Sequence, residues 1–465
     1  MLMNDVCLNM KNRTKKFVLT GMLMVPLLAC NIDFTAFAAD VQEIPATEVE
    51  SVYELPVDSN ALEGWAQGPQ IYSEAGIVMD MDSGAILYAK NIDDQHYPAS
   101  ITKIMTALVA FQHYEMDEVV SFTWDDVGFL EYGDAHIGIK PDEEVGMEDC
   151  MYGMLLASAN EVSHAIGAHI EGGYEAFLEV MNETSEELGC TNSHWMNTHG
   201  LHDPEHYTSC RDMALIGSAV FQYEKFREIT NTYQHTIPVT NITDETRTFQ
   251  QNHDMINTWS NRYYEYCVGG KTGYTDQALT TLVTFATKDM GNGEDMNLVA
   301  VVMRTHGGGR NAYVDTREML DYAFDNFTKV SVPEETVDNE KIAEIDSSSY
   351  VVLPKGISTE QLTTVIDTPT ALGDKTCQIT YMYESTPVGK MTATITDEYH
   401  DEIHGIKEIE KNEVEDDKDE INVASILKIA GIVLVVAAVA FFVLVRYAAH
   451  KRRLMRKRRR RRRRM

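Results

Sequence analysis

The chain has few cysteines. It carries 7 Cys in 465 residues, and the first two fall within the first 30 residues. The other five are Cys150, Cys190, Cys210, Cys267 and Cys377. Their odd number and wide spacing fit neither a disulfide framework nor a zinc site, so we expect free, buried thiols.

Basic residues are scarce outside the C-terminal end. Of the 39 Lys and Arg, 13 follow residue 445, which leaves 26 against 72 Asp and Glu in residues 1–445. A body this acidic argues against nucleic acid as a partner. The apolar fraction of 44% and the charged fraction of 24% are ordinary for a globular protein, and the length allows two or three domains.

The two ends of the chain indicate export and membrane anchoring. Residues 1–38 combine a basic start, a short apolar run and the small-x-small sequence Ala36-Phe37-Ala38, which is typical of an export signal. Lipidation of Cys30 is an alternative. Residues 423–445 are apolar and would span about 34 Å as a helix, which matches a bilayer. The basic tail 446–465 is then cytoplasmic by the positive-inside rule, and the rest of the chain lies outside the cell.

Between these ends the patterning predicts two folded domains. We expect a linker over 39–70, a main domain over 71–328, a small strand-rich domain over 329–399 and an acidic linker over 400–422. Predicted strands cover 76–88 (two, around an Asp-Ser-Gly turn), 267–287, 296–305, 350–356 and 392–395, and predicted helices cover 101–113, 151–170, 174–188 and 311–327.

Three short motifs occur in one order along the main domain. They are Ser100-Ile101-Thr102-Lys103, Ser158-Ala159-Asn160 and Lys271-Thr272-Gly273. Each alone is weak, because it could equally be a helix cap with a surface lysine, a cap in a short loop, or a turn at a strand end. Together they describe a serine acyl-transfer site with a lysine base.

The residue types suit that chemistry. Ser100 is expected at the first turn of a helix, where the backbone N–H groups favour developing negative charge, with Lys103 one turn further on. Lys103 must be neutral to accept a proton, and both burial and the nearby cation Lys271 would favour that form. Ser158 could relay a proton to a leaving amine, while Asn160 could hold the substrate backbone and orient the base.

The third motif is expected to bind substrate. Lys271 and Thr272 would point into a cleft and bind a carboxylate, and Gly273 would let a peptide lie close against the strand.

With these motifs the chain resembles the low-molecular-mass penicillin-binding proteins that are serine-type D-Ala-D-Ala carboxypeptidases. The likeness covers roughly residues 70–400. It includes Tyr97 to Ala107 around the first motif, Leu155 to Asn160 around the second, and Gly270 to Thr275 around the third. The signature Asn197-Thr198-His199-Gly200-Leu201, with His206-Tyr207-Thr208 and Asp212-Met213-Ala214, is also similar.

The resemblance implies a fold, a reaction and partners. The fold would be α/β (α+β), a β-lactamase or transpeptidase-like domain whose antiparallel sheet is flanked by helices, with a small all-β domain and a C-terminal transmembrane helix. Ser100 would attack the D-Ala-D-Ala bond of a peptidoglycan stem peptide, with Lys103 as base and Ser158 as proton donor. Asn160, Lys271, Thr272, Gly273 and Tyr274 would bind substrate, with the backbone N–H groups of Ser100 and Tyr274 as oxyanion hole. β-Lactams would trap the same acyl-enzyme, and neither cofactor nor metal is implied.

Other readings of the sequence remain. A β-lactamase would need a deacylating Glu, and no Glu-x-x-Leu-Asn sequence lies between the second and third motifs. A catalytically idle penicillin sensor or a wall-binding protein would keep the fold without the reaction. His199, His202 and His206 invite a metal hypothesis, but their spacing suits no common zinc site.

The chain also departs from the family pattern at three places. These are Glu161 in place of Asp, Ala278-Leu279-Thr280 in place of a Gly-containing stretch, and Ala312 in place of an Arg.

Overall fold

The computed structural model describes residues 46–404, apart from 292–293, 333–337, 339, 346–349 and 370–373. The described residues up to Thr396 form one compact unit, and those from Asp397 belong to a second. The helices are α1 (Ala46–Tyr53), α2 (Thr102–His113), α3 (Trp124–Val127), α4 (Met147–Leu156), α5 (Asn160–Ala168), α6 (Tyr174–Glu187), α7 (Cys210–Phe221), α8 (Glu224–Thr230), α9 (Gly309–Asn326) and α10 (Asp397–Ile403), with 3-10 turns η1 (Asp58–Ala61), η2 (Ala99–Ile101), η3 (Asp254–Ile256) and η5 (Thr359–Gln361).

The strands form one large sheet and several smaller ones. The strands are β1 (Ser73–Asp80), β2 (Ile86–Lys90), β3 (Val119–Ser121), β4 (Glu144–Gly146), β5 (Gln234–Ile237), β6 (Arg247–Gln250), β7 (Cys267–Thr275), β8 (Leu279–Asp289), β9 (Asp295–Thr305), β10 (Phe327–Ser331), β11 (Ile342–Ile345), β12 (Tyr350–Pro354), β13 (Thr363–Asp367), β14 (Thr376–Tyr383) and β15 (Thr386–Ile395). The five-stranded sheet has the order β2-β1-β9-β8-β7, and its neighbouring strands are all antiparallel.

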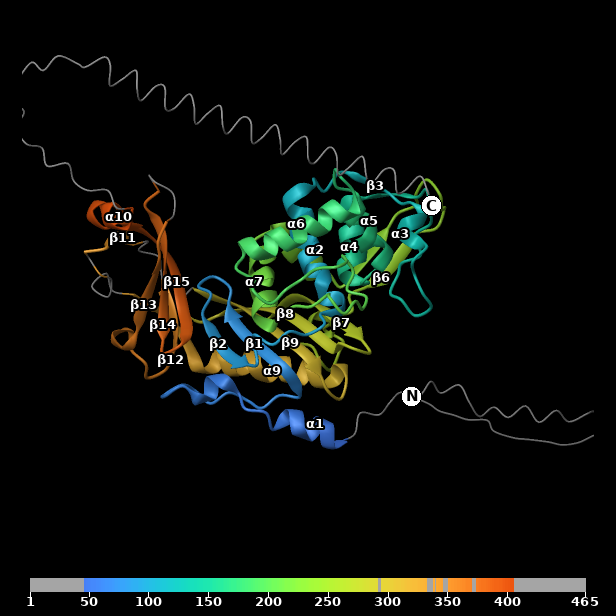
Figure 1. The fold of residues 1–465 in the computed structure, drawn as a ribbon. Coiled ribbons are helices and arrows are strands. Elements are labelled where there is room, and N and C mark those ends of the chain that lie inside the picture. The colour runs from blue at the N-terminus through green and yellow to red at the C-terminus, as the bar shows by residue number, and fades with distance from the viewer. Residues whose placement is uncertain are drawn as a thin grey trace, which may run out of the picture. The chain divides into compact units, whose positions relative to one another are not determined.

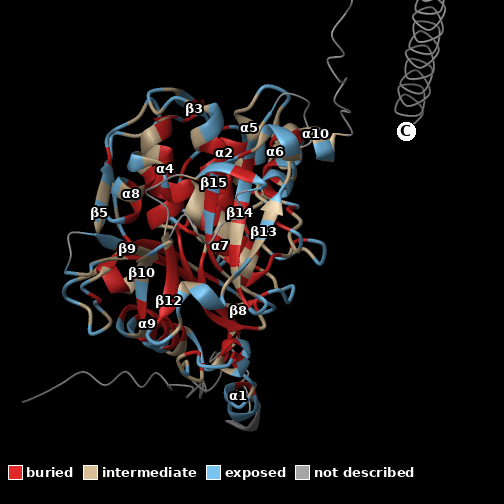
Figure 2. Ribbon diagram, turned by 90° about the vertical axis from the view of Figure 1, so that its left-hand side faces the viewer, coloured by how far each residue is buried: buried red, intermediate tan, exposed pale blue. Residues whose placement is uncertain are grey.

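The central sheet is covered on both faces, so its middle strands read as continuous apolar runs rather than alternating ones. Helix α9 lies against one face, and α7, on which α2 packs, lies against the other (Figure 1). Buried residues run through α2 and the central sheet (Figure 2). The five described cysteines are free and buried, as their spacing predicts.

The segment before the sheet is packed, which corrects the predicted linker over 39–70. Its described part forms α1 and η1, and Trp65 is only 4% exposed. The Trp65 ring lies 5.2 Å from Phe327 and 5.7 Å from Tyr383 between ring centroids, and its Nε1 donates to the carbonyl of Leu87 at 3.2 Å. The apolar residues here are too sparse to give a periodic pattern, so the polar composition of the segment predicts a linker although its described part is packed.

The predicted helix over 151–170 is two helices. α4 ends at Leu156 and α5 begins at Asn160, and between them Ser158 has φ +64°. A left-handed residue cannot continue a right-handed helix, so the chain turns at the second motif. At this break the buried side chains of Ser158 and Asn160 contact the amines of Lys271 and Lys103.

The C-terminal part of the first unit is rich in strands, as expected. β11, β15, β14 and β13 form a four-stranded sheet, and β10 pairs with β12. The expected border between residues 328 and 329 falls inside β10. Within residues 46–404, where placed, no helix combines the length and apolar character needed to cross a bilayer. The predicted span 423–445, the export signal 1–38 and the basic tail 446–465 lie outside the described residues.

Replacing Trp65 tests whether the N-terminal segment belongs to the core. We expect Trp65→Ala to lower the free energy of unfolding by about 3–5 kcal/mol, because it leaves a cavity between β2, β10 and β14. Trp259 is 91% exposed, so Trp259→Ala should change it by less than about 0.5 kcal/mol. Denaturant unfolding of both variants measures the difference. Equal effects would mean that residues 46–70 do not contribute to the fold.

Candidate functional site

Ser100 lies in the 3-10 turn η2, which leads directly into α2. The α-helix itself begins at Thr102, two residues after Ser100. The residue before it, Ala99, has φ +51°. The hydroxyl of Thr102 donates to the carbonyl of Ala99 at 2.8 Å, and His206 Nε2 lies 2.8 Å from the same hydroxyl. Because His206 Nδ1 accepts from the N–H of Met196 at 3.0 Å, Nε2 carries the proton and donates to Thr102. This chain of bonds fixes the strained turn that presents Ser100.

Lys103 is buried beneath Ser100, with its amine in contact with three oxygens. Nζ lies 2.7 Å from Asn160 Oδ1, 2.6 Å from the carbonyl of His199 and 3.2 Å from Ser100 Oγ. Burial, and then the charge of Lys271, hold the pKa of Lys103 well below its usual value. A neutral amine has two hydrogens and one lone pair. Asn160 and His199 can accept the two hydrogens, so the lone pair is left for Ser100.

Lys271 and Ser158 form a second pair beside the first. Lys271 Nζ donates to Ser158 Oγ at 3.0 Å and to the carbonyl of Thr272 at 2.8 Å. Lys271 is 1% exposed, and burial lowers its pKa to about 7. Thr272 follows Lys271 on β7 and is half-buried.

Asn160 begins α5, and the next residue, Glu161, holds a loop over this side of the site. The backbone N–H of Asn160 donates to the carbonyl of Ala135 at 2.8 Å. Glu161 Oε1 accepts from the N–H groups of Ile137 at 2.7 Å and Gly138 at 3.2 Å. Burial raises the pKa of Glu161. The departure from Asp at this position thus has a structural use, because the longer side chain reaches the loop.

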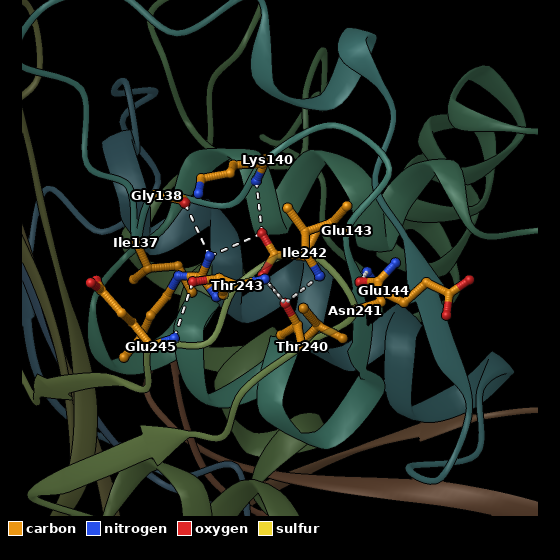
Figure 3. Close-up of polar contacts among 12 residues, drawn as sticks. Ile137, Gly138, Lys140, Glu143, Glu144, Thr240, Asn241, Ile242, Thr243 and Glu245 are labelled. Atoms are coloured by element: carbon orange, nitrogen blue, oxygen red, sulfur yellow. Dashed lines mark hydrogen bonds and ion pairs between the residues drawn. The ribbon is translucent and has the colours of Figure 1, made fainter.

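The same loop is anchored on its far side by Glu143 (Figure 3). The Glu143 carboxylate accepts from the backbone N–H of Lys140 at 2.9 Å and from Thr240 Oγ1 at 2.6 Å. Arg247 pairs with both of its oxygens, at 2.7 and 2.9 Å, and also donates to the carbonyl of Gly138 at 3.3 Å. These contacts tie the loop to the β5–β6 hairpin, so the wall beside Asn160 is fixed from two directions.

β7 is the last strand of the central sheet and runs beside the turn that carries Ser100. A Cβ atom on Gly273 would lie 2.9 Å from the backbone nitrogen of Ser100, so only glycine allows the two to approach this closely. On β8, Thr281 Oγ1 donates to the carbonyl of Pro98 at 2.8 Å. Tyr274 follows with its side chain 63% exposed. The edge strand and the Ser100 turn therefore lie in close contact at Gly273.

The segment Asn197–Leu201 supports the Ser100 turn, because Gly200 lies against Ala99 and the carbonyl of His199 contacts Lys103. Gly200 has φ +86°, and a Cβ there would lie 1.9 Å from the carbonyl oxygen of Ala99. Asn197 Oδ1 accepts from the N–H of Gly200 at 2.6 Å. The His199 ring stacks on Phe129 with 5.1 Å between centroids, and its Nδ1 accepts from the N–H of Leu201. The His199 and His206 rings thus take part in packing and hydrogen bonds.

All eight residues predicted for the site come from the three motifs and the residue that follows the third, and the structure brings the three motifs together. Sequence reasoning missed several supporting residues, among them His206 as a donor to Thr102 and Thr281 as the link between β8 and Pro98. Ala312, where an Arg was expected, is buried in α9. His206 is part of the family signature, but its partner Thr102 is 104 positions away, and no local pattern could have paired the two.

Known structures show the class of fold. Penicillin binding protein 5 from Haemophilus influenzae superimposes with a TM-score of 0.55 at 24% identity, over 71% of this chain and 98% of that one. The Streptomyces K15 DD-transpeptidase gives a TM-score of 0.51 at 22% identity, over 56% of this chain and 100% of that one. The described part of the chain therefore has the α+β fold of penicillin-binding proteins, with the antiparallel sheet that the sequence predicts.

Sequence comparison places the chain in a family. A family model described as D-alanyl-D-alanine carboxypeptidase matches residues 63–307, more than half of the chain. The D-alanyl-D-alanine carboxypeptidase DacF of Bacillus subtilis is 32% identical over 260 residues, which cover 55% of this chain but only 63% of the relative. The enzyme DacA of Haemophilus influenzae is 28% identical over 315 residues, 63% of this chain and 75% of the relative. The chain belongs to the D-alanyl-D-alanine carboxypeptidase family.

The lowered pKa of Lys271 predicts how stability depends on pH. Between pH 7 and 10.5 the unfolded lysine binds a proton and the folded one does not, so stability rises with pH in this window. Relative to Lys271→Met, the wild-type free energy of unfolding should rise by about 2 kcal/mol between pH 7 and 9. Denaturant unfolding of both proteins across this range measures it. A constant difference would show that Lys271 keeps its usual pKa in the fold.

Proposed function

We propose that this protein is a D-Ala-D-Ala carboxypeptidase that removes the terminal D-Ala from peptidoglycan stem peptides through an acyl-enzyme on Ser100. One observation carries the proposal. The buried Lys103 amine has acceptors for two hydrogens in Asn160 and His199, and its third direction faces Ser100 Oγ at 3.2 Å. A lysine held neutral in this way is a general base beside a nucleophile.

In the first step Lys103 takes the hydroxyl proton as Ser100 Oγ attacks the carbonyl carbon between the two D-Ala residues. The oxyanion that forms would lie between the backbone N–H groups of Ser100 and Tyr274. The close approach of β7 to the Ser100 nitrogen at Gly273 supports this placement. The narrow cleft holds the peptide so that the reacting atoms stay aligned.

Ser158 then supplies the proton that the departing D-Ala amine needs. Its hydroxyl accepts a hydrogen bond from Lys271 at 3.0 Å, which leaves its own hydrogen free to point toward the leaving group, and Lys271 can replace the proton. Lys103 then releases the proton that it took from Ser100, and Lys271 regains one, so that both amines return to their starting state. Water attacks the acyl-enzyme next, with Lys103 as base; the proton taken from water passes to Ser100 Oγ as the acyl bond breaks, and the shortened peptide leaves. A β-lactam would acylate Ser100 by the same first step.

The substrate carboxylate is assigned to the Lys271 end of β7. With Ala312 in place of an Arg, Lys271 is the cation that the third motif brings to the cleft, and a bound carboxylate would favour its charged form. Thr272 offers a hydroxyl to the same group.

The proposal includes an extracellular site of action, anchored by residues 423–445 with the basic tail inside the cell. The apolar run and the 13 Lys and Arg that follow it in the sequence support this topology. An export signal over residues 1–38 would deliver the chain to that side.

Ser100→Ala should abolish both release of D-Ala and covalent labelling by penicillin, because both need the same Oγ. Cys150→Ser, at a fully buried thiol away from the proposed machinery, should keep both activities. D-Ala release from acyl-L-Lys-D-Ala-D-Ala and fluorescent penicillin labelling are the two measurements. Labelling that survives in Ser100→Ala would refute the assignment, and labelling without release in the wild type would indicate a penicillin sensor.

Lys271→Ala should weaken carboxylate substrates most. On acyl-L-Lys-D-Ala-D-Ala we expect kcat/KM to fall by a factor of about 100 or more, because the ion pair and the Ser158 contact are both lost. On the same peptide with an amidated C-terminus the variant should lose less relative to wild type. Steady-state kinetics on the two peptides give the ratio. Equal losses would contradict a carboxylate-binding role for Lys271.

A further inference from the structure

A polar cavity of about 330 Å³ lies beside the proposed active site and has no part in the mechanism above. Its lining includes Glu74, Tyr97, Tyr207, Gln277, Ala278 and Arg304. These residues come from the start of β1, the end of β9, the β7–β8 turn, the segment before Ser100 and the loop before α7. The cavity therefore opens where one end of the sheet meets the proposed nucleophile's own loop.

The cavity lies next to the proposed peptide cleft between β7 and the Ser100 turn. Tyr97 stands three residues before Ser100, and Gln277 and Ala278 lie two and three residues after the end of β7. The bond from Thr281 Oγ1 to the carbonyl of Pro98 holds these two sides together. A group that leaves the cleft along the carboxyl end of β7 would enter the cavity.

Arg304 is aimed into this place by the backbone. The pairing of β8 with β9 shifts register between Thr280 and Leu282, and Arg304 has φ +52° at the matching point of β9. Such a bulge redirects a side chain out of the regular ladder. Leu279, in the stretch where a glycine was expected, also has a positive φ of +55°. Two non-glycine residues in the left-handed region beside one cavity are strain that the surrounding structure must support.

The cavity presents one positive and one negative side chain. Arg304 Nε donates to Glu74 Oε1 at 2.8 Å, and its Nη1 donates to the carbonyl of Gln277 at 2.8 Å. His306 Nε2 lies 2.7 Å from the same Glu74 oxygen. The side chains of Arg304 and Glu74 stay 36% and 26% exposed, so a ligand can reach both.

The direction of the substrate follows from the proposed function, on which this inference rests. If the terminal carboxylate lies at Lys271, the peptide runs antiparallel to β7, and the residue before D-Ala-D-Ala lies near Asp276 and Gln277. A long side chain on that third residue points toward the cavity. We propose that the cavity is a specificity subsite for a third stem residue whose side chain ends in both a carboxylate and an ammonium group.

The charge pattern favours this class over a simple diamino acid. A distal carboxylate can take a charge-assisted hydrogen bond from Arg304 while the neighbouring ammonium faces Glu74. A lysine side chain would bring only an ammonium group to the guanidinium. The subsite should therefore favour a diamino-dicarboxylic residue.

Three peptides that differ only at the third residue test the inference on the unmodified protein. They are acetyl-X-D-Ala-D-Ala with X as meso-2,6-diaminopimelate, as the same residue with its distal carboxylate amidated, and as L-lysine. We expect kcat/KM for D-Ala release to be about tenfold higher, or more, for the free acid than for either other peptide, since a charge-assisted hydrogen bond is lost in both. Equal rates on all three would overturn the subsite and leave the proposed function intact. No release from any peptide would overturn both.

Variants locate the effect. Arg304→Gln should bring the ratio of free acid to amide close to one, whereas Arg310→Gln, at an exposed arginine of α9, should keep the wild-type ratio. Rates are normalised to the fraction of protein that penicillin labels. If Arg304→Gln does not label, Glu74→Gln replaces it and should lower the rate on the free acid selectively. A wild-type ratio in the labelled variant would refute the assignment to this cavity.

Discussion

Two lysine amines lie buried where the central sheet meets the helices, and the free energy of keeping them there constrains the rest of the site. An ammonium ion without water is costly, so the fold must either supply acceptors or let the proton go. Lys103 has three oxygens within 3.2 Å and Lys271 has two within 3.0 Å. Burial lowers the pKa of both, and the charge of Lys271 lowers the pKa of Lys103 further. The same burial that costs stability makes one of them a base.

Two loops next to the site hold the oxygens that accept from Lys103, Asn160 Oδ1 and the carbonyl of His199. Asn160 faces Lys103 from the start of α5, after the chain breaks at the left-handed residue Ser158 between two helices. The carbonyl of His199 is positioned by a loop whose Gly200 must approach the backbone of Ala99. Left-handed backbone at two separate places, Ser158 and Gly200, thus converges on a single amine, which is the pattern expected where function outweighs local preference.

The sequence was informative wherever a local pattern carried the chemistry. The three motifs, the strands of the sheet and the closing helix could be predicted because spacing and apolar periodicity report on them directly. The packed segment before residue 70 could not, since Trp65 and the rings that it packs against, Phe327 and Tyr383, are separated by hundreds of positions and form no period. The contacts of Glu161 with the N–H groups of Ile137 and Gly138, and of His206 with Thr102, depend on loops whose path only tertiary structure defines. The prediction of one helix over 151–170 was wrong because the apolar pattern continues across the turn at Ser158, whose positive φ separates α4 from α5.

β7 is an edge strand of the central sheet, so one side of its backbone pairs with no other strand of that sheet and could pair with an extended chain. Exposed edges of this kind are where β-proteins aggregate or exchange strands. Three of its nine residues are glycines, at positions 269, 270 and 273, and glycine is a poor strand former. The Ser100 turn sits beside Gly273 at contact distance. A strand added at this edge would therefore gain few side-chain contacts, and the Ser100 turn would limit it to a short stretch. Under the proposed function, this geometry would favour chain ends over loops or strands of folded proteins.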